Sequence, residues 1–445
     1  MSDIPTPAHA SRLSSTTGRS HHGHQPWIVD VLSRRDRQRA PLASTSSTSN
    51  NGSSDVTPEI QYAPIQCQIP GEHFWGSGAY RNLVYARGPL DNRKPTIVFL
   101  AGAGHLGRVA YGYPGCDPRN FLDHWLKELG FGFLVLSPAP EGNDGTQLSR
   151  SGWAKVAAEQ IGCKFHSSTT FSTTLAIAAW SMGCGLVGPL SGYLQAQRFV
   201  VQGFIPLAGS APLPKPSGNY ITEEIVDPNG MWDVADSQVF GVQRLTVWRE
   251  ELTEIANDCS GSPITLEGYE RHILCKTPAG LMSRSPNPIE RDAPDIGLQS
   301  FPLAAPVSPS RKVDFRHVLT DFSGWHYVNT QNLLGWYINC KKYPIDGDAL
   351  WRDVSGVMFK SLASLQATIR GGHLFFVGER GAQETALALA QLLDDITLIT
   401  AKQRLWSDAC ESNSSAEIAP NDAKIGSRVC VDLEKYSIQR QTERN

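Results

Sequence analysis

The sequence predicts an α/β protein with a mostly parallel sheet and helices on both of its faces. Apolar runs of strand length recur along the middle of the chain, the clearest being PTIVFLAGAG at 95–104 and TTLAIAAWS at 173–181. Helical stretches separate these runs, as at 117–130, where Asp117 suits the start of a helix. Strands and helices that alternate in this way indicate parallel strands joined by crossover helices.

The remaining elements follow from the same two periodicities. We expect further strands at 78–88, 131–140, 201–210, 333–339 (a run that extends to 336–340 as WYINC) and 364–370, and further helices at 239–257, 349–362 and 379–396. In the last of these, Ala382, Ala386, Leu389 and Leu393 recur at three and four residues, which predicts one apolar helix face.

Composition divides the chain into five segments. A polar stretch at 1–58, rich in Ser, Thr, Asn and Gly, lacks the apolar surface that folding requires, so we expect it to be disordered. The strand and helix pattern then predicts a first core part at 59–211, an inserted cap at 212–332 with many prolines and aromatic residues, and a second core part at 333–401. A polar tail is expected at 402–445.

Charge and cysteine usage exclude several classes of protein. The net charge is −3 and the sequence pI is about 6.5, so no basic excess attracts nucleic acid or anionic lipid. The nine cysteines are scattered without a C-x-x-C pair, and no H-E-x-x-H motif occurs, so we expect neither a metal nor another cofactor. No apolar run reaches the roughly 20 residues of a membrane span, and the N-terminus lacks the apolar middle of a secretory signal. Cytoplasmic localisation is the resulting expectation.

Ser181 is the first candidate for chemistry. It ends the apolar run LAIAAW and is followed by MGCG, so a strand turns into a helix at a serine. A nucleophilic serine at such a turn needs small neighbours, because strand and helix approach closely there. Ala179 and Gly183 supply them as A-W-S-M-G, one methyl group away from the usual G-x-S-x-G. The alternative is an ordinary serine at a strand end that caps the next helix.

A glycine-rich loop, AGAGHLGR at 101–108, follows the strand at 95–100. Acyl-transfer enzymes need two backbone N–H groups directed at the carbonyl oxygen that becomes negative. One donor belongs to the residue after the nucleophile and the other to this loop, which predicts Met182 and Ala103 for an oxyanion hole. His105 and Arg108 could contact a substrate, although an exposed loop position is the preferred interpretation of each.

His373 is the candidate base, because it follows the last core strand in RGGHLFF and two glycines leave its ring room to reach a serine. The acid that orients this imidazole is expected after the run at 336–340. Asp346 is preferred because Gly347 suits a tight turn, with Asp348 as the alternative and Asp353 as a third choice.

These motifs resemble the α/β-hydrolase superfamily over residues 78–210 and 333–396. The resemblance is carried by VFLAGAG, AAWSMGCG and RGGHLFF, and by the chain order Ser, Asp, His. It implies an eight-stranded, mostly parallel sheet with a cap inserted after the sixth strand. Ala101 stands where the frequent His-Gly start of the oxyanion loop would have histidine.

The leading functional hypothesis is a serine hydrolase that cleaves an ester, thioester or lactone through an acyl-Ser181 intermediate. The expected partner is a small-molecule ester-type substrate, such as a hydrophobic secondary metabolite. Two alternatives use the same scaffold: an acyltransferase, cyclase or C–C lyase, and a non-catalytic binding protein.

Overall fold

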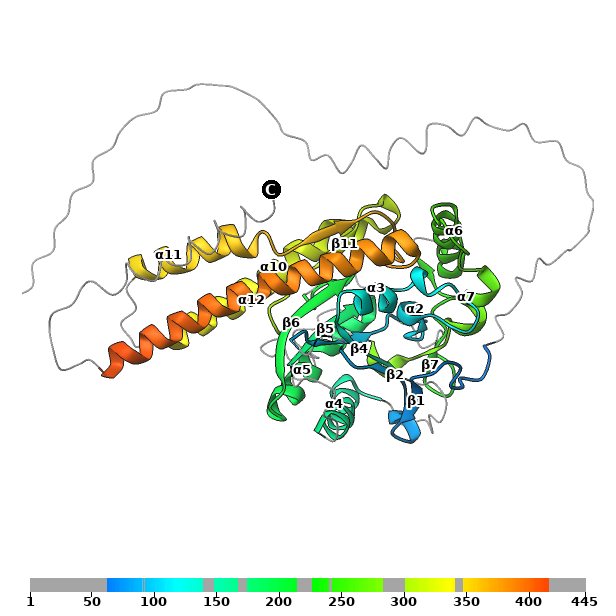
Figure 1. Ribbon diagram of the computed structural model, residues 1–445, viewed down its shortest axis with the longest axis horizontal. Helices are drawn as coiled ribbons and strands as arrows, with labels where there is room; N and C mark the ends of the chain where they lie inside the picture. Colours follow the sequence, from blue (N-terminus) through cyan, green and yellow to red (C-terminus); the bar gives the residue numbers. More distant parts are fainter. Residues whose placement is uncertain are drawn as a thin grey trace, which may run out of the picture. The chain divides into compact units, whose positions relative to one another are not determined.

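The computed structural model of the chain describes residues 62–89, 91, 93–138, 148–166, 174–213, 226–239, 242–282, 301–340 and 347–415. These residues belong to one compact unit, Gln61–Asn445, built around an eight-stranded sheet (Figure 1). The polar segment 1–58 and the end of the chain after residue 415 lie outside the described residues.

The sheet has the strand order β1-β2-β4-β3-β5-β6-β11-β12. The strands are β1 (Glu72–Trp75), β2 (Asn82–Arg87), β3 (Thr96–Leu100), β4 (Gly132–Pro138), β5 (Thr174–Trp180), β6 (Val200–Leu207), β11 (Val307–Pro309) and β12 (Ala367–Ile369). Strand β2 runs antiparallel to β1 and β4, and all the other pairs are parallel. The expected eight-stranded, mostly parallel sheet is therefore confirmed.

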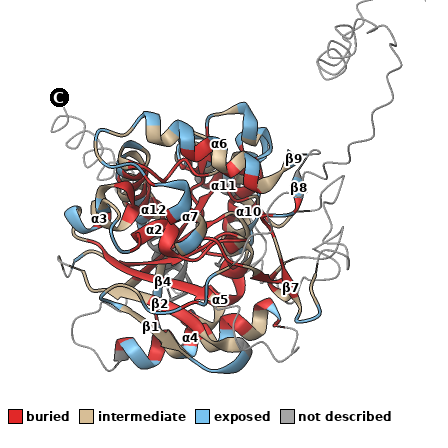
Figure 2. Cartoon of the chain, turned by 90° about the vertical axis from the view of Figure 1, so that its right-hand side faces the viewer, coloured by how far each residue is buried: buried red, intermediate tan, exposed pale blue. Residues whose placement is uncertain are grey.

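The central strands are continuous apolar runs because both of their faces are covered. Val98 and Leu100 of β3 join one core cluster with helices α4 (Arg150–His166) and α5 (Val187–Ala196). Phe99, which alternates with them, packs instead against Phe376 on the other face. Figure 2 shows mostly buried residues along the strands inside the molecule, as at β4.

Helices cover both faces of the sheet. Helices α4 and α5 pack together on one face, and α3 (Leu122–Glu128) packs with α12 (Glu379–Ser415) on the other (Figure 1). The remaining helices are α2 (Arg108–Tyr111), α6 (Arg244–Asn257), α7 (Leu266–His272), α10 (Phe315–Cys340) and α11 (Gly347–Gly356). Short strands outside the main sheet are β7 (Met231–Trp232), β8 (Gln238–Val239), β9 (Val242–Gln243) and β10 (Thr277–Pro278).

Two expectations about the second half of the chain are wrong. The apolar run at 333–340, expected to be a strand, forms the C-terminal part of helix α10, where Leu333 and Tyr337 are buried four residues apart. The seventh strand of the sheet is instead β11, which lies inside the predicted cap 212–332. The inserted segment therefore ends before β11, and the second part of the sheet begins there.

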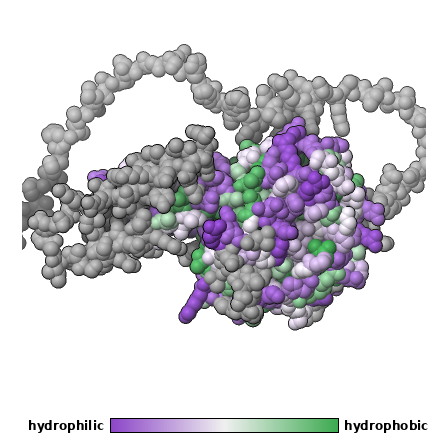
Figure 3. Space-filling model, viewed as in Figure 1, coloured by the Kyte–Doolittle hydropathy of each residue, from purple (hydrophilic) through white to green (hydrophobic). Residues whose placement is uncertain are grey.

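The C-terminal helix is also longer than predicted. Helix α12 continues from Glu379 to Ser415, although a polar tail was expected from residue 402. Among the described helices, none combines the length and the apolar character needed to cross a lipid bilayer. The face of the described residues seen in Figure 3 is largely hydrophilic, with smaller apolar areas between the polar ones.

Candidate active site

Ser181 occupies a strained turn between strand β5 and the short 3-10 helix η4 (Ser181–Leu186). Its φ angle is 52°, in the left-handed region that non-glycine residues rarely adopt. Such a conformation persists only where the surrounding structure determines it. Strand β5 supplies that constraint, because Ala179 next to the turn is buried and pairs with Leu100 on one side and Pro206 on the other.

Small residues let this turn pack directly on the end of strand β3. A Cβ added at Gly183 would lie 2.6 Å from the carbonyl oxygen of Leu100, and one at Gly209 would lie 2.0 Å from the Sγ of Cys184. Only glycine fits at either position without displacement of the chain. The steric requirement predicted around Ser181 is met, and the extra methyl group of Ala179 is accommodated in the core.

The glycine-rich loop after β3 lies beside the Ser181 turn. A Cβ at Gly102 would approach the indole ring of Trp180 to 2.8 Å, so the loop packs on the residue that precedes Ser181. The N–H of Gly104 donates to Thr277 Oγ1 over 2.7 Å, so this N–H is not available to an oxyanion. The N–H of Met182, at the start of η4, has no carbonyl of its own helix to bind. Ala103 and Met182 thus follow two neighbouring strands, β3 and β5, at the same edge of the sheet.

His105 and Arg108 are buried rather than exposed. His105 is in contact with the carbonyl of Ala103 through Nδ1 (2.9 Å) and with Tyr269 Oη through Nε2 (2.5 Å), and burial lowers its pKa to about 3. A neutral ring whose Nδ1–H donates to Ala103 and whose Nε2 accepts from Tyr269 explains both contacts. The Arg108 guanidinium donates to Glu72. Both side chains therefore fix the loop.

His373 lies on the loop after β12 and contacts the residue next to Ser181. The indole Nε1 of Trp180 donates to the carbonyl oxygen of His373 over 3.0 Å, and the two rings lie 5.1 Å apart. The Nδ1 of His373 is 2.8 Å from Asp314 Oδ2. The side chains of His373 and Asp314 are 17% and 15% exposed.

Among the described residues, the carboxylate beside His373 is that of Asp314. Asp346 lies outside the described residues, and Asp348 is exposed in the first turn of α11. The sequence prediction followed the apolar run at 336–340, which is helical. Asp314 instead follows β11, a three-residue strand that ends in Pro309.

The environment of Asp314 keeps its carboxylate ionised. Burial works to raise the pKa of Asp314, but the imidazole of His373, its hydrogen bond, His317 and Arg316 together lower the pKa to about 2. An ionised Asp314 accepts the proton on His373 Nδ1 and leaves Nε2 as the ring's free acceptor.

Strand order and turn geometry together match what the motifs imply. The strained serine follows the fifth strand of the sheet and the histidine follows the last strand. The chain has the α/β-hydrolase fold. This assignment rests on its own strand order and on the turn at Ser181.

No family model matches the sequence, and no curated protein sequence matches it. Solved structures that the chain resembles include an arylesterase, with 10% identity over 76% of this chain and 88% of that chain (TM-score 0.37). A fungal esterase from Rhizomucor miehei is 13% identical over 73% of this chain and 83% of its own (TM-score 0.36). The thioesterase domain from the curacin biosynthetic pathway is 14% identical over 72% and 98% (TM-score 0.34).

A second histidine lies beside the His373–Asp314 pair of this α/β-hydrolase fold. The ring of His317 is 5.2 Å from that of His373, and its Nδ1 lies 3.0 Å from the buried carboxylate of Asp321. The Arg316 guanidinium donates to His317 Nε2 over 2.8 Å, which requires a neutral ring. Burial likewise lowers the pKa of His317.

One group of possible metal ligands occurs in the described part of the chain. Asp314, His317 and His373 each place a ligand atom within 4.8 Å of the others. The hydrogen bonds described above already engage Nδ1 of His373 and both nitrogens of His317. Nδ1 of each ring donates to a carboxylate and Nε2 of His317 accepts from Arg316, so none of these three nitrogens has a lone pair left for a metal ion.

Glu251 reaches the histidine loop from helix α6 of the inserted segment. Its carboxylate accepts the backbone N–H groups of His373 (3.0 Å) and Leu374 (2.9 Å). Gly372 makes this approach possible, because a Cβ there would lie 2.4 Å from Glu251 Oε1. Burial raises the pKa of Glu251. Sequence analysis missed this residue, since one acid among several in a helical stretch carries no distinguishing signal.

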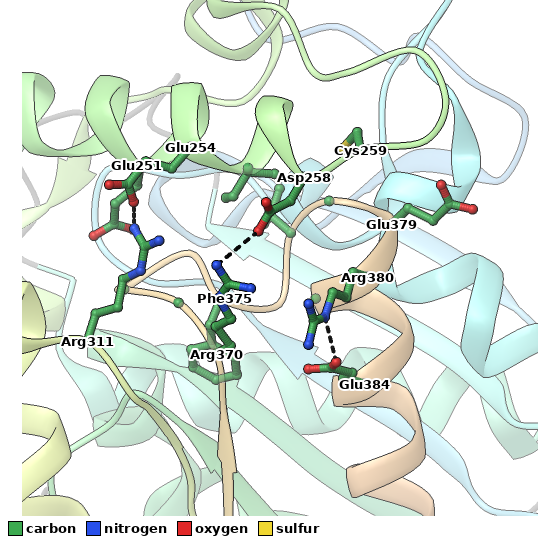
Figure 4. A pocket seen from close by; sticks show the side chains of 16 residues that line it. Glu251, Glu254, Asp258, Cys259, Arg311, Arg370, Phe375, Glu379, Arg380 and Glu384 are labelled. Atoms are coloured by element: carbon green, nitrogen blue, oxygen red, sulfur yellow. Dashed lines mark hydrogen bonds and ion pairs between the residues drawn. The ribbon is translucent and has the colours of Figure 1, made fainter.

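Ion pairs continue this contact along α6. Figure 4 shows acidic side chains of α6 facing arginines from the loops that carry Asp314 and His373. Arg311 pairs with Glu254, and Arg370 lies 3.8 Å from Asp258. These ion-paired residues line the pocket drawn in Figure 4, so the pocket lies at the contact between α6 and the histidine loop.

Proposed function

We propose that the protein is a serine hydrolase that cleaves an ester, thioester or lactone through an acyl-enzyme intermediate. Ser181 is the nucleophile, His373 the general base and Asp314 the acid that orients the imidazole. The N–H groups of Met182 and Ala103 form the oxyanion hole. The strand order supports this assignment, because the five residues follow the strands β3, β5, β11 and β12 of one sheet.

The proposed reaction has two halves. As Ser181 Oγ attacks the carbonyl carbon, His373 Nε2 takes the hydroxyl proton, and the carbonyl electron pair moves onto oxygen, where the Met182 and Ala103 N–H groups donate to it. Collapse of this intermediate breaks the bond to the leaving alcohol or thiol, which receives the proton from the imidazolium. A water molecule then repeats the sequence on the acyl-serine and releases the carboxylic acid.

One observation carries the proposal: Ser181 has a φ angle of 52°, and its neighbour Trp180 contacts the histidine loop. The Trp180 indole donates to the backbone carbonyl of His373, and the imidazole of His373 is paired with Asp314. An ordinary helix-capping serine has extended backbone geometry and needs no such strain. Strain of this kind gathers at functional sites. Asp314 would stabilise the imidazolium that forms when Ser181 loses its proton.

A panel of p-nitrophenyl esters, thioesters and lactones tests the proposal. We expect Ser181→Ala to lower kcat for any cleaved substrate by at least about 10³-fold, because the covalent route is lost. Ser364→Ala is the matched control, since Ser364 is exposed and its hydroxyl donates to the carbonyl of Ser361. Activity that survives Ser181→Ala would refute the mechanism.

A further inference from the structure

One face of helix α6 covers the candidate site. Arg244, Trp248 and Glu251 are spaced at i, i+4 and i+7, so they share that face. Trp248 packs on His105 with ring centroids 4.4 Å apart, and Glu251 binds the backbone of the histidine loop. This face of α6 therefore contacts both the loop that carries Ala103 and the loop that carries His373. Arg244 lies on the same face, at the N-terminus of the helix.

Arg244 is a half-buried cation with one buried, unpaired donor in the described part of the chain. Its Nε is buried without a hydrogen-bond partner among the described residues, and its guanidinium lies 5.9 Å from the centre of the Trp232 ring. Burial and the charge of Arg316 lower the pKa of Arg244 to about 10, so it remains protonated at neutral pH. A buried charged donor without a partner is costly, and proteins keep few of them.

Several other arginines of the chain that pack against the protein are paired with carboxylates. Arg108 donates to both oxygens of Glu72, Arg87 binds Asp123, and Arg249 of the same helix pairs with Glu270. Each is neutralised by a carboxylate within 3 Å. No carboxylate of the described residues pairs with Arg244, which separates it from these packing arginines.

Two charged groups among the described residues act electrostatically on Arg244. They are Arg316, on the first turn of α10, and the carboxylate of Asp314. Asp314 is already engaged by His373 Nδ1. Arg316 donates to a neutral His317 and keeps its positive charge. The guanidinium groups of Arg244 and Arg316 thus both interact electrostatically with Asp314, whose carboxylate already accepts from the imidazole of His373.

We propose that Arg244, assisted by Arg316, binds a carboxylate of the substrate, so that the preferred substrate is an acidic ester. The inference rests on the proposed hydrolase function and names its substrate class. A planar guanidinium donates two parallel hydrogen bonds to a carboxylate, and the neighbouring Trp232 limits the directions from which it can be reached. The carboxylate would satisfy the buried Nε and offset the repulsion between the two arginines.

Two esters that differ in one charge test this inference. Mono-p-nitrophenyl glutarate carries a free carboxylate, and its methyl ester is the neutral counterpart. We expect wild-type kcat/KM to favour the acidic ester by about tenfold or more, the effect of one charge-assisted hydrogen bond. Arg244→Gln should abolish this preference and Arg316→Gln should reduce it. Arg249→Gln, the matched control on the same helix, should keep the wild-type ratio.

Binding separates this inference from the hydrolase proposal. Calorimetric titration of the two esters into Ser181→Ala protein measures affinity whether or not Ser181 is the nucleophile. Tighter binding of the acidic ester, lost when Arg244→Gln is added, supports the inference. Equal affinity for the two esters, or a preference that survives Arg244→Gln, overturns it. Absence of Ser181-dependent turnover with a retained binding preference would instead refute only the hydrolase proposal.

Discussion

The Ser181 turn and the His373 loop are held by different kinds of contact. At Ser181 the contacts are backbone ladders and close packing, with strand β5 paired on both sides and Gly183 against the carbonyl of Leu100. At His373 the supporting strand β12 is three residues long and lies at the edge of the sheet. There the carboxylates of Asp314 and Glu251, both from other segments, hold the loop.

This difference predicts where single substitutions act. Packing around Ser181 is shared among many buried atoms, so no one polar contact dominates it. The position of His373 depends on a few polar contacts, each of which one substitution removes. We therefore expect polar substitutions near His373 to lower activity strongly while the sheet itself remains folded.

The largest effect is expected at Asp314. Asp314→Asn replaces the acceptor of the Nδ1 proton and lets the imidazole adopt the wrong tautomer, which should lower kcat on the order of 10³- to 10⁴-fold. Steady-state hydrolysis of a p-nitrophenyl ester measures it. Asp348→Asn is the control, because that residue lies in the first turn of α11, and its activity should match wild type. Equal losses in the two variants would contradict the assignment of Asp314.

An intermediate effect is expected at Glu251. Glu251→Gln leaves one acceptor oxygen for two N–H groups, so the His373 loop should shift and kcat should fall about 10- to 100-fold. The unfolding free energy should change little, because the substitution also removes the cost of a buried charge, which the raised pKa of Glu251 indicates. Kinetics and urea unfolding of the same protein separate the two roles.

Glu250→Gln is the matched control for that experiment, since Glu250 is exposed on α6. If Glu251→Gln lowered stability and activity in parallel, a purely structural role would explain the contact better than positioning of the histidine.

The smallest effect concerns acid stability. The pKa of Asp314 is about 2 against an ordinary 3.8, so its ionised form contributes on the order of 2 kcal/mol of stability above pH 4. Because this pKa is depressed in the folded state, that contribution is lost as the pH falls from about 4 towards 2. Urea unfolding of wild type and Asp314→Asn should show a stability difference that shrinks over this range. A difference independent of pH would contradict the charge-based account.

The same comparison explains which features the sequence could predict. Strands β3, β4 and β5 are largely apolar runs because both of their faces are buried. The small residues that the Ser181 turn requires lie within two positions of it in the sequence. Local sequence therefore predicts this half of the site.

The other half depends on contacts that local sequence does not encode. Strand β11 has three residues and ends in a proline, so it lacks the length of a readable strand. The apolar run at 333–340 resembles a strand only when its helical spacing of buried residues is overlooked. Asp314 and Glu251 meet His373 only through the fold, across 59 and 122 residues of sequence.

Covalent labelling tests the central claim most directly. A fluorophosphonate probe reacts with a serine only when a neighbouring base activates it, and peptide mapping then identifies the labelled residue. The proposed mechanism predicts that the probe labels Ser181 in wild type and that labelling falls sharply in His373→Ala. A wild-type protein in which Ser181 stays unlabelled, or in which its labelling is unchanged by His373→Ala, would contradict it.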